Sequence, residues 1–181
     1  MLPLGGTGRR PKGAPVSAQL QFNSAPTQRE PLTLADLDAV MAIEQSVYPF
    51  AWSRGNFIDS LAAGYSAFLL REPAGPPCAY VVAMPGVQEM HLLNITVAPA
   101  WQQRGLARML LDGLTVDCRQ AGAVWLWLEV RESNHRAREV YRRYGFEQVG
   151  WRRSYYPAAA GQREDACVMR LATGEPADAL E

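Results

Sequence analysis

Residues 124–130, Val-Trp-Leu-Trp-Leu-Glu-Val, constrain the fold most, because apolar side chains point to both faces of this expected strand. A strand that is apolar on both sides belongs in the middle of a sheet, with helices covering each face. An amphipathic helical pattern precedes the strand over residues 106–121, and a second helical pattern follows Asn134 and ends at Gly145. This order predicts a mixed α/β sheet in a single domain, with helices on both faces.

Shorter patterns complete this sheet. Helical spacing is expected over residues 34–47, with Thr33 as the cap and Pro49 at the end, and over a second short helix that starts at Ser53. Further strands are expected over residues 67–70, 79–84, 89–97, 146–152 and 166–171. The last two should flank a loop that contains Tyr155, Tyr156 and Pro157.

The two ends of the chain lack these patterns. Glycine and proline interrupt every period over residues 1–27, and the segment lacks the apolar core of about 7–15 residues that a secretory signal needs. We therefore expect a disordered extension over residues 1–27, a folded domain over residues 28–173 and a flexible tail over residues 174–181.

Composition excludes several classes of protein. Three widely spaced cysteines and two histidines form no metal-ligand spacing, so we expect no metal and a reduced, cytoplasmic chain. No apolar run approaches the roughly 18 residues of a membrane span, so no membrane partner is expected. A net charge of zero and the lack of a basic-aromatic strand motif argue against direct binding of nucleic acid.

The charge is nevertheless uneven along the chain. Residues 31–100 hold two basic and six acidic residues, whereas residues 101–170 hold twelve arginines and eight acidic residues. This split predicts an anionic ligand on one half of the molecule and a cationic ligand on the other.

Residues 97–108 leave a strand and enter the long helix, which predicts a phosphate site. Gly105 and Ala107 let a ligand approach the free amides at the helix start, while Arg104 and Arg108 add positive charge. Neither GxxxxGK[ST] nor GxGxxG occurs there, so the common nucleotide loops are unsupported. On these residues alone, an ordinary strand-to-helix turn is an equally good interpretation.

The spacing Gln102-x-x-Gly105-x-Ala107 resembles the pyrophosphate loop of the GNAT family of N-acetyltransferases, which use acetyl-CoA. Other segments that are similar to this family are residues 49–53, 93–97, 125–134, 140–146, 152–157 and 164–166, so the resemblance extends in order from about Pro31 to Leu171. Together these segments look most like the RimI-type enzymes of the family, which acetylate the N-terminal alanine of a small-subunit ribosomal protein.

The resemblance implies a sheet splayed at its centre and a set of cofactor contacts. Backbone groups on the third expected strand would bind acetyl-CoA as an added strand, and the loop and helix start would bind its diphosphate. The residues implied are Ile95, Thr96, Val97, Gln103, Arg104, Gly105, Leu106, Ala107 and Arg108, together with Asn134, which would both cap its helix and contact the pantetheine arm.

Glu129 is the candidate general base. It shares a strand face with Trp125 and Trp127, close to the carboxyl end of the strand, where ligands of open α/β sheets bind. The indoles should reduce its hydration and make it a stronger base. A structural acid paired with Arg131 or with a backbone amide is the alternative, and the resemblance favours the base.

Tyr141 is the candidate general acid. It lies on the apolar stripe of its helix, where a tyrosine is usually a packing residue. The resemblance implies that its phenol protonates the departing CoA thiolate, while Tyr144, one turn later, remains a packing residue.

The acceptor should lie between the acidic half of the chain and the Tyr155–Tyr156 loop, where a negative groove would attract a basic N-terminus. The expected partner is the N-terminus of a ribosomal protein or of another protein, with an accessory protein as a further possibility. An acetyltransferase for lysines or small amines, and a CoA-binding module without turnover, remain as alternatives.

Overall fold

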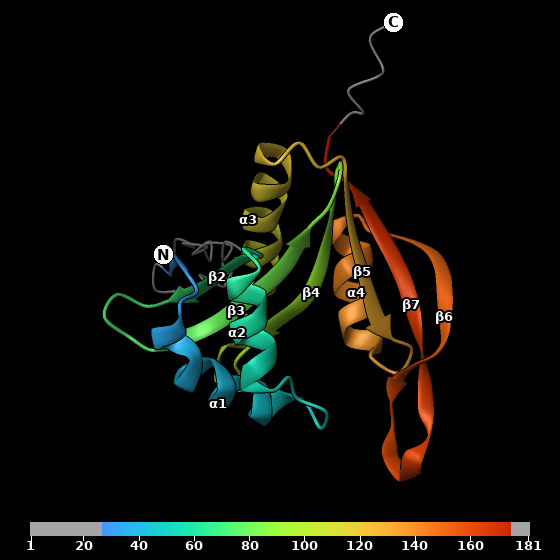
Figure 1. Ribbon diagram of the computed structural model, residues 1–181, viewed down its shortest axis with the longest axis horizontal. Coiled ribbons are helices and arrows are strands. Elements are labelled where there is room, and N and C mark those ends of the chain that lie inside the picture. The colour runs from blue at the N-terminus through green and yellow to red at the C-terminus, as the bar shows by residue number, and fades with distance from the viewer. Residues whose placement is uncertain (1–26, 175–181) are drawn as a thin grey trace, which may run out of the picture.

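The strands form one mixed sheet (Figure 1). The computed structural model describes residues 27–174 of the chain. The sheet has seven strands in the order β1-β2-β3-β4-β5-β7-β6. All neighbours are antiparallel except β4 and β5. The strands are β1 (Gln28–Pro31), β2 (Ser66–Arg71), β3 (Pro77–Pro85), β4 (Glu89–Val97), β5 (Trp125–Arg131), β6 (Glu147–Pro157) and β7 (Arg163–Ala172).

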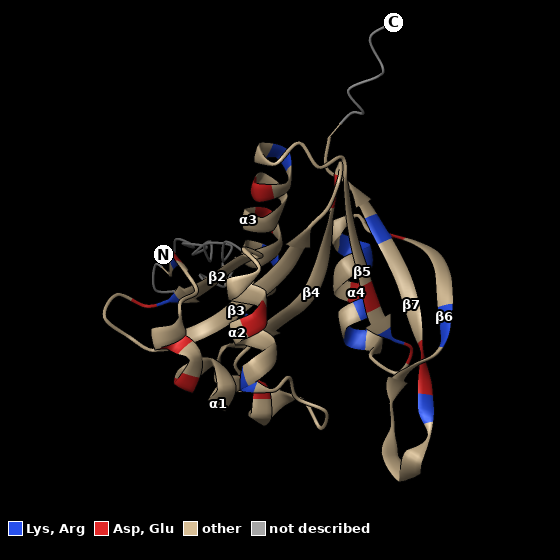
Figure 2. Ribbon diagram, in the orientation of Figure 1, with Lys and Arg blue, Asp and Glu red and all other residues tan. Residues whose placement is uncertain are grey.

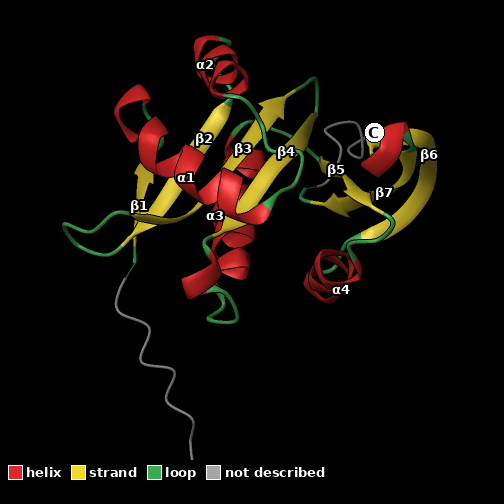
Figure 3. Cartoon of the chain, turned by 90° about the horizontal axis from the view of Figure 1, so that it is seen from below, coloured by secondary structure: helices red, strands yellow, loops and turns green. Residues whose placement is uncertain are grey.

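Four α-helices cover the sheet from two sides, as the view from below shows (Figure 3). They are α1 (Leu37–Val47), α2 (Arg54–Ala62), α3 (Leu106–Gln120) and α4 (His135–Tyr144). The apolar residues of α1 and α2 pack with Leu69, Tyr80 and Val82 in one core cluster. The apolar stripe of α3 and Tyr141 of α4 belong to a second cluster, with Val81, Leu126 and their neighbours. The predicted α/β class, with helices on both faces, is confirmed.

Local signals explain the helix boundaries. Ser53 caps α2 by accepting a bond from the amide of Asn56, and Asn134 caps α4 in the same way. Gly145 ends α4 at a φ of 120°, a conformation that residues other than glycine seldom adopt. Thr33 is the N-cap of a single turn of 3₁₀ helix ahead of α1 and forms a capping box with Asp36, whose carboxylate accepts bonds from the Thr33 amide at 2.9 Å and its hydroxyl at 2.7 Å.

The strands of the structure differ from the predicted ones in two places. Tyr155, Tyr156 and Pro157 lie in β6 and not in a loop, because the strand resumes its pairing at Tyr156–Glu164 after an irregular stretch that follows Arg152. That irregularity, with Ser154 at a φ of 50°, breaks the alternation that the sequence pattern needed. Strand β1 was not anticipated, because it is a short edge strand whose side chains are mostly exposed.

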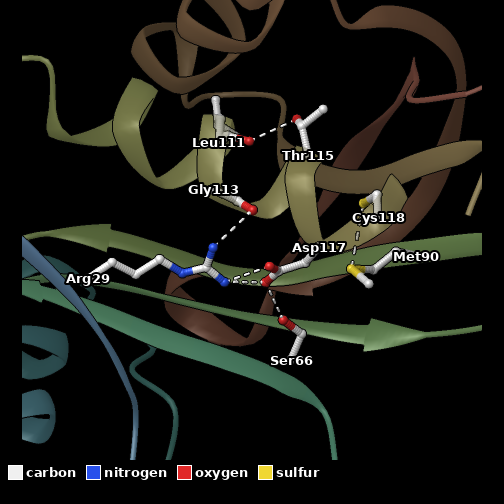
Figure 4. A network of polar contacts seen from close by, with 8 residues as sticks. All are labelled: Arg29, Ser66, Met90, Leu111, Gly113, Thr115, Asp117 and Cys118. Atoms are coloured by element: carbon white, nitrogen blue, oxygen red, sulfur yellow. Dashed lines mark hydrogen bonds and ion pairs between the residues drawn. The ribbon is translucent and has the colours of Figure 1, made fainter. Parts of the chain in front are cut away.

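An ion pair attaches β1 to the rest of the fold (Figure 4). Arg29 donates to both carboxylate oxygens of Asp117 on α3, each at 2.6 Å, and Ser66 of β2 donates to the same carboxylate at 2.9 Å. The Arg29 guanidinium also lies 3.8 Å from the centre of the Phe68 ring. Gly113 permits this close packing, because a Cβ atom there would lie 3.0 Å from the Phe68 ring.

The expected extension over residues 1–27 and the expected tail over residues 174–181 lie outside the described residues, apart from Thr27 and Gly174. Within residues 27–174, no helix is both long enough and apolar enough to cross a bilayer.

Candidate active site

The site begins where β4 and β5 separate. Their parallel pairing runs from Glu89–Trp125 to Leu92–Leu128 and goes no further. In the ladder with β3, Leu93 falls between the paired residues Leu92 and Asn94, which is a bulge in β4. Beyond it, residues 94–97 and 129–131 border a gap, so the expected splay at the centre of the sheet is present.

Two cavities occupy this gap. The Glu129 cavity, of about 320 Å³, is bordered by β4, β5, the α1–α2 segment and the end of β6. The Gly105 cavity, of about 370 Å³, is bordered by β4, α4 and the loop that leads into α3. The two cavities meet, because they share five lining residues: Tyr48, Ile95, Asn134, Ala137 and Tyr141.

The backbone of β4 offers ligand-binding groups at this gap. The amide of Ala98 donates to the carbonyl of Cys78 across the ladder with β3. Hydrogen-bonded pairs alternate in an antiparallel ladder, so Thr96 directs its backbone groups towards Tyr80. Ile95 and Val97 therefore direct theirs into the gap. Of the three strand residues implied by the resemblance, these two face the gap, while the Thr96 hydroxyl bonds to Tyr48 and Asn94. The Ile95 carbonyl accepts a bond from the Tyr48 hydroxyl and the Val97 carbonyl accepts one from Gln102, each at 3.2 Å, so the two amides are the groups that an added strand would use.

The loop before α3 presents its backbone to the Gly105 cavity. Gln103 and Gly105 have φ angles of 63° and 83°, and no atom lies within 4 Å of the position that a Gly105 Cβ would occupy. The amides in the first turn of a helix lack partners within the helix, and they carry partial positive charge. Leu106 contributes only backbone, because its side chain is in the core.

Most of the expected phosphate-binding residues line this cavity. Gln103, Gly105, Leu106, Ala107 and Arg108 all do so. Arg104 is not among the lining residues, and its guanidinium lies 4.8 Å from the centre of the Trp101 ring. The loop thus has the form of an anion site built from amides, with Arg108 as its nearest expected cation.

Asn134 has the structural role that its position predicts. Its Oδ1 accepts a hydrogen bond of 3.0 Å from the amide of Ala137, which caps α4. The same side chain lines both cavities. Capping uses only Oδ1, so the Nδ2 group is compatible with the second role that the resemblance implies.

Tyr141 stands where the two cavities meet. It is 8% exposed and packs against Phe146 with ring centres 5.6 Å apart. Burial raises the pKa of its phenol well above the usual value, and the nearby Tyr48 and Tyr156 act in the same direction. The group therefore stays protonated and can donate a proton throughout the neutral range.

Glu129 faces the other cavity with its side chain 13% exposed. Its Oε1 lies 3.0 Å from Nη2 of Arg152 on β6, and its backbone carbonyl accepts a bond of 2.8 Å from the Tyr156 hydroxyl. The alternative partner proposed for it, Arg131, instead pairs with Glu164 at 3.2 Å. The Glu129 carboxylate thus lines this cavity with an arginine as its partner.

The expected negative groove is not present as the charge pattern predicted. Of the six acidic residues in residues 31–100, only Glu44 lines the Glu129 cavity. Others pair elsewhere, for example Asp38 with Arg54 and Asp36 with Arg71. Phe50 and Trp52 from the α1–α2 segment and Tyr156 with Pro157 from β6 form aromatic and apolar walls instead, and Tyr155 is not among the lining residues.

Sequence reasoning missed Glu44, Tyr48 and Arg152. Glu44 is 1% exposed and accepts hydrogen bonds from the Tyr80 hydroxyl, the Trp52 amide and the Asn94 side chain. A carboxylate at a buried position of the α1 stripe, seven residues after Leu37, was the available signal. No local pattern marks Arg152, because its contact with Glu129 crosses from β6 to β5.

Figure 2 shows where the basic residues (blue) and the acidic residues (red) lie in the molecule. Basic and acidic positions are frequent along α4, β6 and β7, whereas the strands β3 and β4 are almost wholly tan. The three cysteines, Cys78, Cys118 and Cys167, are free and buried, so they are packing residues.

Known proteins resemble this chain in both sequence and architecture. The model of the acetyltransferase (GNAT) family matches residues 37–146. The [ribosomal protein bS18]-alanine N-acetyltransferase of Escherichia coli K12 is 39% identical over 140 residues, which is 77% of this chain and 93% of that protein. The enzyme of the same name from Haemophilus ducreyi is 34% identical over 78% of this chain and 97% of its own length.

A crystal structure of the ribosomal-protein-S18-alanine N-acetyltransferase from Escherichia coli superposes with a TM-score of 0.78 and 35% identity. The match covers 86% of this chain and 99% of that structure. The family match, the shared architecture and the split sheet with its amide-lined loop agree. The chain belongs to the GNAT family of acetyltransferases.

Proposed function

We propose that this protein transfers an acetyl group from acetyl-CoA to the N-terminal α-amine of a protein, with the alanine terminus of a small-subunit ribosomal protein as its substrate. The relatives at 39% and 34% identity carry that activity in their names. The observation that carries the proposal is the pair of cavities that meet at Tyr141. Two substrates can thus reach one point from different sides of the sheet. Such a substrate would place the protein in the cytoplasm.

The residues of the Gly105 cavity fit acetyl-CoA, which supplies an activated acetyl thioester. The amides from Gly105 to Arg108 would bind its diphosphate, and Gln103 lies beside them. The backbone groups of Ile95 and Val97 would hold the pantetheine arm, together with Asn134. An amide of β4 would also polarise the thioester carbonyl.

Glu129 would accept a proton from the acceptor amine, and Tyr141 would donate one to the leaving sulfur. The amine enters through the Glu129 cavity, so the base faces the acceptor while the acid stands at the junction. Direct attack of the amine requires no acyl-enzyme, which agrees with three buried cysteines. Tyr141 suits the second role because burial keeps its phenol protonated.

The different basicities of the two kinds of amine support the proposed acceptor class. An α-amine has a pKa of about 7.7–8.0 and is partly neutral near pH 7, whereas a lysine amine at about 10.4 is almost wholly charged. A carboxylate is a modest base, and Glu129 is the candidate in this site. It suffices for an N-terminus, and this supports an α-amine over a lysine.

The test is a mass-spectrometric assay of purified protein with acetyl-CoA and matched peptides. One peptide begins with a free alanine and lacks lysine, and a second has a blocked N-terminus and an internal lysine. We expect acetylation of the first alone, and slower acetylation when the terminal alanine is replaced by a bulkier residue. Labelling of the blocked peptide alone would make the protein a lysine acetyltransferase, and CoA binding without any product would make it a binding module.

A further inference from the structure

Arg136 reaches the Gly105 cavity from the wall that faces the amide loop. It lies in the first turn of α4, and its Nη1 donates to Oε1 of Gln102 at 2.9 Å. Gln102 in turn donates from Nε2 to the carbonyl of Val97 at 3.2 Å. A chain of hydrogen bonds thus runs from the end of β4 to α4 and holds the guanidinium at this cavity.

No carboxylate among residues 27–174 forms an ion pair with Arg136. Arg142 and Arg143 of the same helix both pair with Glu139, at 2.9 and 2.6 Å. Arg138 also has no carboxylate partner among the described residues, but it donates to the Glu132 carbonyl and does not line this cavity. Arg131 and Arg152 also have acidic partners. The amide oxygen of Gln102 orients Arg136 without neutralising it. The guanidinium therefore remains available to an anion.

The cavity has a place for that anion. Its other wall consists of the amides from Gly105 to Arg108, where a diphosphate would bind. A guanidinium presents a planar fork of donors that matches phosphate oxygens in a bidentate manner. Arg108 is the second cation on the lining, and its side chain is 75% exposed and only 3.9 Å from Asp112.

We propose that Arg136 is a phosphate-binding residue supplied by α4, which holds the diphosphate of CoA against the start of α3, and that Gln102 positions it. This assignment rests on the proposed use of acetyl-CoA. It makes the diphosphate a bridge between the two halves of the split sheet, since Gln102 follows β4 and Arg136 follows β5. It also makes the protein selective for acyl carriers that bear phosphate over those that lack it.

Calorimetric titration with CoA and with pantetheine, which lacks the diphosphate, tests this role. In Arg136→Ala we expect the Kd for CoA to rise about 10-fold or more and the Kd for pantetheine to stay unchanged. The KM for acetyl-CoA should rise in parallel, while kcat at saturation should not change. Arg136→Lys keeps the charge but loses the bidentate fork, so its affinity for CoA should fall between those of the wild type and Arg136→Ala.

Arg143→Ala is the matched control, because it removes the same charge from an exposed position of the same helix. Its affinity for CoA should equal that of the wild type. Equal CoA affinity in both alanine variants would overturn the assignment, and so would an equal loss for CoA and pantetheine, which would indicate packing alone. Either result leaves N-terminal acetylation intact, whereas a wild-type chain that bound no CoA would overturn both proposals.

Discussion

The two halves of the sheet differ in what covers them. The half formed by β1–β4 has α1 and α2 on one face and α3 on the other, and apolar side chains fill both interfaces. In the half formed by β5–β7, the α1–α2 face carries Trp125, Trp127 and Glu129 on β5, with Arg152 and Arg170 on the neighbouring strands. The first half is buried on both faces, whereas the second has a buried apolar face on the α4 side and directional contacts between charges and rings on the other.

This difference has a chemical consequence. Charged groups are costly to bury in a core that is covered on both faces, so the fully covered half can offer few of them. The uncovered face of β5 can hold a carboxylate beside the gap, with Arg152 as its partner. The covered half contributes backbone groups and the Glu44 network instead. Each half thus supplies the site with what its own packing permits.

Loss of the proposed proton-transfer groups should have the largest effect. Glu129→Gln and Tyr141→Phe should each lower kcat by about 10²-fold or more, because each removes a proton acceptor or donor. Affinity for CoA should be unchanged, because Glu129 lies outside the Gly105 cavity and phenylalanine keeps the ring with which Tyr141 lines it. Steady-state kinetics with an alanine-initiated peptide would measure this. Because burial raises the pKa of Tyr141, wild-type activity should also show no alkaline decline near pH 10, where an ordinary tyrosine ionises.

Tyr144→Phe is the control for this experiment. Its hydroxyl bonds to Asp112 at 2.9 Å and to Thr115 at 3.1 Å, away from both cavities. Its kcat should remain within about twofold of the wild type, since no proton transfer depends on it. A kcat in Tyr141→Phe as high as in Tyr144→Phe would refute the proposed acid.

Matched leucine truncations test the difference in packing between the halves. Leu69 on β2 is fully buried under α1 and α2, whereas Leu171 on β7 is only partly buried. Leu69→Ala should lower the free energy of unfolding by about 2–5 kcal/mol, as large cavities in tight cores do. Leu171→Ala should cost about 1 kcal/mol, because less apolar surface is lost. Chemical denaturation would measure both, and equal losses would show that Leu171 is packed as tightly as Leu69.

The sequence predicted those parts of the fold that local periodicity controls. The β5 pattern, the α3 stripe and the caps Ser53 and Asn134 each depend on neighbouring residues, and the structure has them where they were expected. The boundaries of β6 were missed because an irregular stretch after Arg152 interrupts the pattern, and pairing with β7 is what extends the strand to Pro157.

The site divides in the same way. Gly105 and its helix start were recognisable because a loop and the helix it begins are contiguous, and Glu129 because it follows two tryptophans on one face. The acidic groove failed because a charge count does not reveal pairing, and most of those acids lie away from the cavity. The Arg152–Glu129 and Arg136–Gln102 contacts join distant segments, so only the fold could reveal them.

The smallest effect should come from the ion pair that attaches the β6–β7 hairpin to β5. Glu164 is partly buried, which opposes its ionisation, but hydrogen bonds from Ser133 and Arg131 outweigh this and lower its pKa below the usual value of 4.5. A lowered pKa stabilises the fold above about pH 4.5, and this contribution is lost as the pH falls further.

Glu164→Gln should therefore lower the free energy of unfolding by about 0.5–1 kcal/mol near pH 7 and by almost nothing near pH 3. Thermal melts at both values would show the difference shrinking with acid. Asp38→Asn, which breaks an exposed pair with Arg54, is the control and should cost less than Glu164→Gln near pH 7. A cost for Glu164→Gln that grew on acidification would have the wrong sign for a carboxylate of lowered pKa, and the cohesion of this half would then depend on its ring contacts rather than on its charges.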